Sequence, residues 1–245
     1  MTITSIQNEK VKFWTGLKLK KNRDKHKCFL IEGDHLIAEA KKKNLIIETI
    51  SLNDPTADYQ VTKEIMAKIS EQKSISSDIA VVKYIPNKEI IGNILILDDI
   101  QDPGNLGTLI RSSIAFNFPN IILSNNSVDL YNSKVIRATE GMIFQTNVIR
   151  TDLKDAINKL KEDNYTIIGT DVLKGKEIKN ISAKNYAIIL GNEGNGVNKE
   201  INDLSDYLVN IKMSKNIESL NVGIAGSILM LSLIHISEPT RLRCI

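Results

Sequence analysis

The sequence predicts an α/β protein made of two units, the second of them built on a parallel sheet. From about residue 94 onward, short apolar runs alternate with segments of helical periodicity, as in folds whose parallel strands are joined by helices. The run Ile94–Leu97 is wholly apolar and is closed by Asp98 and Asp99, which is typical of a strand buried on both faces. In the preceding residues, expected strands and helices also alternate. This stretch of about 85 residues is long enough to form a small hydrophobic core of its own.

In the first unit we expect a helix that begins at Ser5–Asn8, followed by a lysine-rich segment. The further elements expected in this unit are strands at Phe29–Ile31, Ile46–Leu52 and Ala80–Ile85 and helices at Leu36–Lys43 and Thr62–Ser70. A polar connector starts at Pro86, and Gly92 precedes the next buried strand. We therefore predict domains at residues 1–88 and 92–230.

In the second unit, Ile94–Leu97 leads into a turn at Asp102–Asn105, where proline fixes φ, glycine frees it and Asn105 can cap a helix. The apolar face of that helix consists of Leu106, Leu109, Ile110 and Ile114. The elements expected after it are strands at Ile121–Leu123, Tyr165–Gly169, Tyr186–Leu190 and Tyr207–Ile211 and helices at Lys134–Phe144, Leu153–Leu160 and from Leu220 to about Met230.

The composition is that of an ordinary globular protein, with 42% hydrophobic and 25% charged residues. No apolar stretch is long enough to span a membrane, and no secretory core follows the N-terminus, so we expect a cytoplasmic protein. Two cysteines and three histidines without ligand-like spacing predict no metal site.

The charge is unevenly distributed along the chain. Residues 1–28 contain seven lysines and one arginine against Glu9 and Asp24, a net charge of +6, and because the whole chain carries +3, the remainder carries −3. A basic arm beside a slightly acidic body favours a polyanionic partner such as RNA. A solubilising terminus explains the same charges equally well.

Three polar patches follow expected strands in the second unit. The first is Asn105 with Arg111, and the second is the glycine-rich run 191–196, GNEGNG, whose backbone amides can approach a ligand closely. The third is Ser219–Asn221 at the start of the last helix. The glycine-rich run fits neither the dinucleotide fingerprint nor the P-loop. Taken singly, the patches are also compatible with a turn, a glycine hairpin and a helix cap.

Together, in this order, the patches resemble the three motifs of the SpoU (TrmH-like) branch of the SPOUT RNA methyltransferases. The segments that carry the resemblance are DPGNLGTLIRSS, SKVIRATEGMIF, ILGNEGNGV and IKMSKNIESLNVGIA, between about Ile94 and Met230. The N-terminal segment SIQNEKVKFWTGLKLKKNRDKHKCFLIEGDHLI is similar to the family's substrate-binding domain, which resembles ribosomal protein L30e.

The resemblance implies a parallel α/β fold with a deep C-terminal trefoil knot, preceded by the small L30e-like domain. It implies a homodimer that uses S-adenosylmethionine to methylate a ribose 2′-oxygen, with 23S rRNA expected before tRNA. The residues it implies for the cofactor are Leu190, Gly191, Asn192, Gly194, Gly196, Ile211, Met213, Leu220 and Val222.

The residues that the resemblance implies for catalysis are Asn105, Arg111, Glu193, Ser219 and Asn221. Because a guanidinium accepts no proton, we expect Arg111 to hold an RNA phosphate and to stabilise alkoxide charge, with Glu193 orienting it. The residues expected to contact RNA are Lys10, Lys18, Lys20, Lys21, Arg23, Ser133, Lys134 and Arg137.

Two features depart from the family pattern. Lys212 stands where the family often has proline, and Leu231–Arg241 matches the translation of a common sequencing-transposon adapter. We therefore predict a non-native tail at residues 231–245, a helix that stops by Glu238 before Pro239, and weakened dimerisation. Arg241, Arg243 and Cys244 are expected to be exposed.

Two other functions remain open alternatives. A non-catalytic RNA-binding protein would keep the fold, although the five polar residues of the motifs argue against it. A nucleotide-binding oxidoreductase lacks the required fingerprint at every strand–helix turn.

Overall fold

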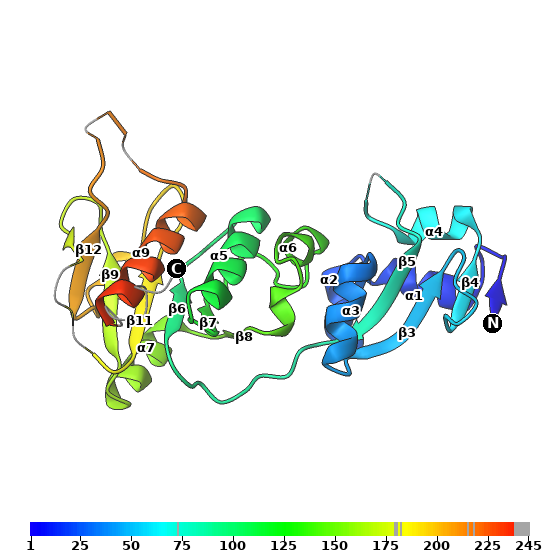
Figure 1. Cartoon of the computed structure of the whole chain (residues 1–245), viewed down its shortest axis with the longest axis horizontal. Helices are drawn as coiled ribbons and strands as arrows, with labels where there is room; N and C mark the ends of the chain where they lie inside the picture. Colours follow the sequence, from blue (N-terminus) through cyan, green and yellow to red (C-terminus); the bar gives the residue numbers. More distant parts are fainter. Residues whose placement is uncertain (73, 179–180, 182, 215, 218, 238–245) are drawn as a thin grey trace, which may run out of the picture. The chain divides into compact units, whose positions relative to one another are not determined.

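The structure, a computed structural model, describes residues 1–72, 74–178, 181, 183–214, 216–217 and 219–237 (Figure 1). It divides into two compact units. The first comprises Met1–Pro86 with Asp129–Phe144, and the second comprises Asn87–Val128 with the chain from Gln145 onward.

The first unit contains a mixed sheet covered by short helices. Its elements are β1 (Thr2–Ile3), α1 (Glu9–Gly16), α2 (Lys20–His26), β2 (Cys28–Glu32), α3 (Asp34–Lys42), β3 (Ile46–Ser51), β4 (Tyr59–Val61), α4 (Lys63–Ile69), β5 (Asp78–Lys83), α6 (Ser133–Ala138) and the 3₁₀ helix η1 (Met142–Phe144). The strand order is β1-β4-β3-β5-β2, with β5 antiparallel to both of its neighbours. All the elements expected up to residue 85 are present. The sequence did not reveal α2, β1 or β4, because these short segments have no apolar periodicity.

The segment Asp129–Phe144 differs from expectation in two ways. Its Ile136, Ile143 and Phe144 belong to the same apolar core as Phe29 and Ile31 of β2, so it packs with the first unit. The single helix expected at Lys134–Phe144 is wrong: α6 ends at Ala138 and η1 begins at Met142. Glu140 and Gly141 break the helix, because both have positive φ, of 48° and 81°.

The second unit is the parallel α/β fold that the alternating pattern predicts. Its elements are β6 (Ile94–Leu97), α5 (Pro103–Ala115), β7 (Asn120–Leu123), β8 (Asn147–Arg150), α7 (Leu153–Glu162), β9 (Thr166–Thr170), β10 (Lys176–Glu177), β11 (Tyr186–Leu190), α8 (Lys199–Asn202), β12 (Tyr207–Asn210) and α9 (Val222–Ser237). Every pairing described in the sheet β10-β12-β9-β11-β6-β7-β8 is parallel. The carboxyl ends of β6 and β11 lie side by side, with Leu97 opposite Leu190.

Helices cover this sheet closely. Leu153, Ile157 and Leu160 of α7 join the apolar core formed by β6, β9 and β11. Helices α5 and α9 pack against each other (Figure 1), and Ser227 Oγ donates to Ser112 Oγ at 2.7 Å. A Cβ at Gly226 of α9 would lie 2.5 Å from Leu190 Cδ1 and 2.6 Å from Leu109 Cδ2. Glycine at this position therefore lets α9 lie against both β11 and α5.

Helix α9 continues past Met230 to Ser237, and Leu233 is fully buried. The helix thus extends a few residues into the suspected tail, as expected. The expectations for Glu238, Pro239, Arg241, Arg243 and Cys244 lie outside the described residues. None of the helices that the structure describes combines the length and apolarity needed to cross a membrane.

Candidate functional site

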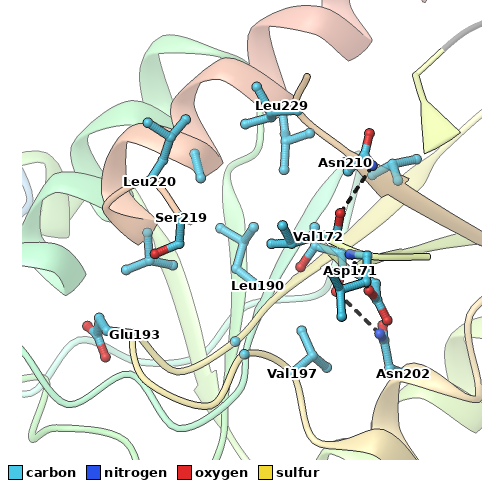
Figure 2. A pocket seen from close by; sticks show the side chains of 18 of the residues that line it. Asp171, Val172, Leu190, Glu193, Val197, Asn202, Asn210, Ser219, Leu220 and Leu229 are labelled. Carbon is cyan, nitrogen blue, oxygen red and sulfur yellow. Dashed lines mark hydrogen bonds between the residues drawn. The ribbon is translucent and has the colours of Figure 1, made fainter. Parts of the chain in front are cut away.

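A pocket of about 470 Å³ lies among the loops that follow β9, β11 and β12 (Figure 2). Its volume is in the range of small-molecule and cofactor sites, roughly 300–1,000 Å³. The lining residues are 170–173, Leu190, Gly191, 193–197, Asn202, 209–211, Met213, Ser219, Leu220, Val222, Ala225 and Leu229. Glu193 and Ser219 lie on one side of the view, and Asp171, Val172 and Asn210 lie on the other (Figure 2).

The pocket brings together most of the residues that the resemblance implies for the cofactor. Those that line it are Leu190, Gly191, Gly194, Gly196, Ile211, Met213, Leu220 and Val222. Asn192 does not line the pocket, and its side chain instead stabilises the glycine-rich loop through hydrogen bonds. Its Nδ2 donates to the Asp99 carbonyl at 2.9 Å, and its Oδ1 accepts from the amides of Gly194 and Asn195.

Sequence reasoning missed the contribution of the loop after β9. Residues 170–173 line the pocket, and the side chain of Asn210 fixes this loop by donating to the Gly175 carbonyl at 2.7 Å. The signal was available: β9 was expected as a strand of the same parallel sheet, so its carboxyl end had to lie at the ligand-binding edge.

The glycine-rich loop is folded tightly on itself. A Cβ at Gly191 would lie 2.1 Å from both Gly196 C and Val197 N, a separation that no side chain tolerates. Gly196 has φ of 70°, and its amide donates to the Asn192 carbonyl at 2.9 Å. The loop therefore depends on glycine at both ends, where its backbone approaches itself most closely.

A chain of polar side chains links all three sequence motifs. Asn105 Nδ2 donates to Glu193 Oε1, and Asn221 Nδ2 donates to Asn105 Oδ1, each at 2.8 Å. Asn221 Oδ1 accepts from the amides of Gly223 and Ile224 at the start of α9. The side chains named from separate motifs thus meet at one place beside the pocket.

Asn105 does not have the capping role expected for it. Helix α5 begins at Pro103. Asp102 caps it, because Asp102 Oδ1 accepts a hydrogen bond from the backbone N–H of Asn105 at 2.8 Å. Proline at the first helical position needs no donor there, which explains why the helix begins earlier than the sequence suggested. The side chain of Asn105 is therefore free to hold Glu193 and Asn221.

Arg111 lies on the exposed face of α5. Among the residues that the structure describes, its guanidinium has no hydrogen bond or ion pair. The expected pairing of Glu193 with Arg111 is not among the contacts that the structure describes, and Glu193 instead accepts a hydrogen bond from Asn105. Arg111 retains all five of its donors for an external anion.

Asp98 supports the far end of the glycine-rich loop. It is 9% exposed, and its Oδ2 accepts from the Asn198 amide at 2.8 Å. Burial raises the pKa of the Asp98 carboxyl, although the hydrogen bond from Asn198 acts in the opposite direction. The carboxylate ties β6 to the loop that closes the pocket.

The basic residues of the first unit are partly occupied within the protein. Lys10 Nζ lies 2.6 Å from Glu48 Oε2, and this hydrogen bond raises the pKa of Lys10. Lys18 Nζ donates to the carbonyls of Lys68 and Ser70. Lys20 is exposed and pairs with Asp24. The other expected RNA contacts in this unit are exposed or half-buried, and these are Lys21, Ser133, Lys134 and Arg137.

Arg23 was expected to contact RNA, but the structure places it inside the first unit. Its side chain is 7% exposed, and Nη2 lies 2.5 Å from Asp129 Oδ2. Nη1 donates to the carbonyls of Leu17 and Lys18. A guanidinium enclosed in this way holds α2 against the segment that starts at Asp129, and it is not available to a phosphate.

No group of three or more His, Cys, Asp or Glu side chains among the described residues is placed to hold a metal ion. The candidate site instead consists of a pocket lined by backbone and apolar groups, a polar side-chain chain beside it, and an exposed arginine.

Two family models match the chain. The SpoU rRNA Methylase family matches residues 92–231, and the MRM3-like substrate binding domain matches residues 8–80. Among curated proteins, the 23S rRNA (guanosine(2553)-2′-O)-methyltransferase RlmP of Bacillus subtilis is 33% identical over 241 residues, which cover 93% of this chain and 97% of that protein. A putative TrmH family tRNA/rRNA methyltransferase of Staphylococcus aureus is 26% identical, with 80% of each chain covered.

Solved structures share the fold over nearly the whole chain. An AdoMet-bound rRNA methyltransferase from Sinorhizobium meliloti superposes with a TM-score of 0.86 at 23% identity, covering 96% of this chain and 97% of that one. The SpoU methyltransferase AviRb from Streptomyces viridochromogenes, in complex with AdoMet, gives a TM-score of 0.82 at 19% identity, covering 94% and 98%.

Proposed function

The chain belongs to the SpoU rRNA methylase family, and from that premise we propose that it methylates a ribose 2′-oxygen of 23S rRNA with S-adenosylmethionine. The observation that carries this proposal is the junction of the three motifs. Asn105, Glu193 and Asn221 form one hydrogen-bonded chain beside the pocket, and Arg111 lies on the helix that begins at this junction.

The pocket suits an adenosyl sulfonium cofactor. The close approach of Gly191 to Gly196 leaves a narrow backbone cradle that any larger residue would fill. Leu190, Leu220 and Leu229 provide an apolar wall, and loop backbones provide donors and acceptors for polar edges. When bound, S-adenosylmethionine supplies an electrophilic methyl group, whose transfer needs no metal.

The protein's own task is to position and activate the ribose hydroxyl. Arg111 can bind an RNA phosphate through two parallel hydrogen bonds and stabilise the negative charge that develops on the attacking oxygen. Glu193 is fixed by Asn105, and Asn105 is fixed by Asn221, so the carboxylate does not depend on a ligand for its position. Ser219 lines the pocket and offers a hydroxyl to RNA phosphate or to the cofactor. Placing both reactants together lowers the barrier.

An in vitro assay tests the proposal. The purified protein would be incubated with methyl-labelled S-adenosylmethionine and either unmodified 23S rRNA or unmodified tRNA, followed by mass mapping of the product. We expect one 2′-O-methyl group in 23S rRNA and none in tRNA. Methyl transfer to tRNA alone would contradict the choice of substrate, and absence of cofactor binding would contradict the function.

We further propose that two copies associate through α5 and α9. The exposed side chains of Ile224, Ile228 and Leu231 recur at intervals of four and three residues along α9, and therefore form an apolar stripe. Arg111 of the neighbouring α5 is also exposed. The suspected tail begins at Leu231, so we expect this chain to dimerise more weakly than a version with a family-like helix end. Sedimentation of both proteins tests this.

The family membership also supports a trefoil knot in the C-terminal part and a cytoplasmic location, where rRNA is available. We keep as a proposal the division into an RNA-contacting region at residues 1–88 and a catalytic region at residues 92–230. The segment Asp129–Phe144, which packs with the first unit, is assigned to the RNA-contacting region. Lys21 and Lys134 are the exposed members of the proposed RNA surface for which the structure describes no ion pair.

A further inference from the structure

A second hollow lies at the edge of the parallel sheet in the methyltransferase unit. This groove, of about 790 Å³, is lined by Lys174, Lys176, Glu177, Ile181, Asp206, Tyr207, Leu208 and Val209. Val209 also lines the cofactor pocket, so the groove and the pocket are neighbours across β12. Neither the motifs nor the proposed mechanism uses it.

The groove combines an apolar floor with an exposed aromatic ring. Ile181 and Val209 are almost completely buried, at 4% and 2% exposure, whereas Tyr207 is 50% exposed at the start of β12. Among the described residues, the Tyr207 hydroxyl has no hydrogen-bond partner. A half-exposed tyrosine beside an apolar floor offers a face on which a planar group can stack.

The net charge available at the rim is positive. Asp206 is neutralised by Lys161 at 3.1 Å and accepts from the Ile167 amide, and Glu177 lies 3.7 Å from Lys212. Lys174 and Lys176 are exposed, and no ion pair of either appears in the part of the chain that the structure describes. The two acidic side chains are thus engaged by lysines outside the groove, while its own two lysines remain available to an anion.

The lysines are carried by an anchored segment. A Cβ at Gly175 would lie 2.4 Å from Val209 C, so the chain between the two lysines packs directly on β12. Asp171 Oδ1 accepts from the amides of Leu173 and Lys174, and Asn210 Nδ2 donates to the Gly175 carbonyl. The same short segment therefore borders the cofactor pocket through Leu173 and the groove through Lys174.

We propose that this groove binds a nucleotide of the RNA substrate other than the methylated one. The base stacks on Tyr207 above the apolar floor, and its phosphates contact Lys174 and Lys176. The inference rests on the proposed function. Stacking on an exposed aromatic ring with lysines beside it is the common way in which proteins hold single-stranded RNA without reading its sequence.

Three variants test the two parts of the proposal. Lys174→Gln/Lys176→Gln is expected to weaken binding to unmodified 23S rRNA about ten-fold, and to reduce the slope of log K against log salt by about 1.4, or about 0.7 for each lost phosphate contact. Tyr207→Ala is expected to weaken binding about five- to ten-fold with an unchanged salt slope, whereas Tyr207→Phe retains the ring and should bind as the wild type does. RNA binding would be followed by fluorescence anisotropy.

The matched control is Lys154→Gln/Lys159→Gln, which removes the same charge from exposed positions on α7. Its RNA affinity should remain within two-fold of the wild type, and all variants should bind S-adenosylmethionine normally by calorimetry. Equal RNA affinity of the groove variants, the α7 variant and the wild type would overturn the proposal. In that case the alternative occupant of this sheet edge, at β10, would be a protein. Failure of the proposed function would instead appear in the wild type, as absent cofactor binding or methyl transfer.

Discussion

The loops around the pocket and the basic helices of the first unit differ in how many of the residues noted in the sequence remain accessible to a ligand in the folded protein. In the pocket, Gly191, Gly196 and the Asn105–Glu193–Asn221 chain converge on one place. In α1 and α2, acids of the protein itself engage two of the cations: buried Arg23 binds Asp129, and partly exposed Lys10 binds Glu48. Both regions carry an evident chemical signal in the sequence, but only the first signal marks the positions that remain open to a ligand.

The difference follows from what each signal depends on. A glycine between two buried strands reports a backbone constraint, and that constraint is local to the chain. A lysine or arginine reports only a charge, and whether it faces solvent depends on acids that lie far away, such as Asp129 for Arg23. Charge counts therefore predict a kind of partner, whereas they do not identify the contacting residues.

The largest effect is expected at the glycine-rich loop. Gly191→Ala would place a Cβ 2.1 Å from the backbone of Gly196 and Val197, so the loop must move and the pocket must change shape. We expect no measurable binding of S-adenosylmethionine by isothermal titration calorimetry. Gly16→Ala in the first unit is the control, because its Cβ would meet only the side chain of Asn22, at 3.2 Å, and Gly16 does not line the pocket. Normal binding by Gly191→Ala would show that the close approach is not needed.

The next effect concerns the free guanidinium on α5. Arg111→Lys keeps the positive charge but loses the planar arrangement of donors that binds a phosphate through two hydrogen bonds. We expect kcat to fall about a hundred-fold, as for loss of a group that stabilises developing charge, with cofactor affinity nearly unchanged. Single-turnover methylation combined with calorimetry separates the two quantities. A lysine variant with near wild-type turnover would mean that a point charge is sufficient.

The third prediction compares two variants within α2 itself. Arg23→Met leaves Asp129 partly buried without its partner, and should lower the free energy of unfolding by about 2 kcal/mol. Lys21→Met should leave stability unchanged and weaken RNA binding by a small factor, with a lower salt dependence. Urea denaturation and anisotropy titrations measure these effects. Equal stability of the two variants would return Arg23 to the set of candidate RNA contacts.

Much of the fold could be predicted because uninterrupted apolar runs such as Ile94–Leu97 and Tyr186–Leu190 have no stable alternative to burial. The short elements could not: α2 has the sequence KKNRDKH, with no apolar periodicity, and it depends on Arg23 for its attachment. The break at Glu140 and Gly141 was equally hidden, because it depends on side chains such as Glu39 that pack against Gly141 from another helix.

Site residues whose position depends on the adjacent sequence were predicted, whereas those whose position depends on the packing of distant segments were not. Glu193 and Gly191 follow directly from the strand before them. The role of Asn105 was misassigned because Asp102 and Asn105 both suit a helix cap, and the preference of Pro103 for the first helical position, which favours Asp102, was not used. Asp171 and Val172 were missed because their importance arises from the neighbouring position of β9 and β11 in the sheet.

The smallest expected effect concerns Asp98, which ties the carboxyl end of β6 to the pocket loop through the Asn198 amide. Burial raises the pKa of Asp98 in the folded protein above its ordinary value of 3.8, so the stability linked to this group is fully present below that value and is lost as pH rises through the folded pKa. Asp98→Asn keeps an oxygen that can accept from Asn198, and it does not titrate. We therefore expect the Tm of the variant relative to wild type to increase from pH 4 to pH 7. Calorimetric scans across this range would measure it, and a constant difference would show that the charged form of Asp98 costs the folded state nothing.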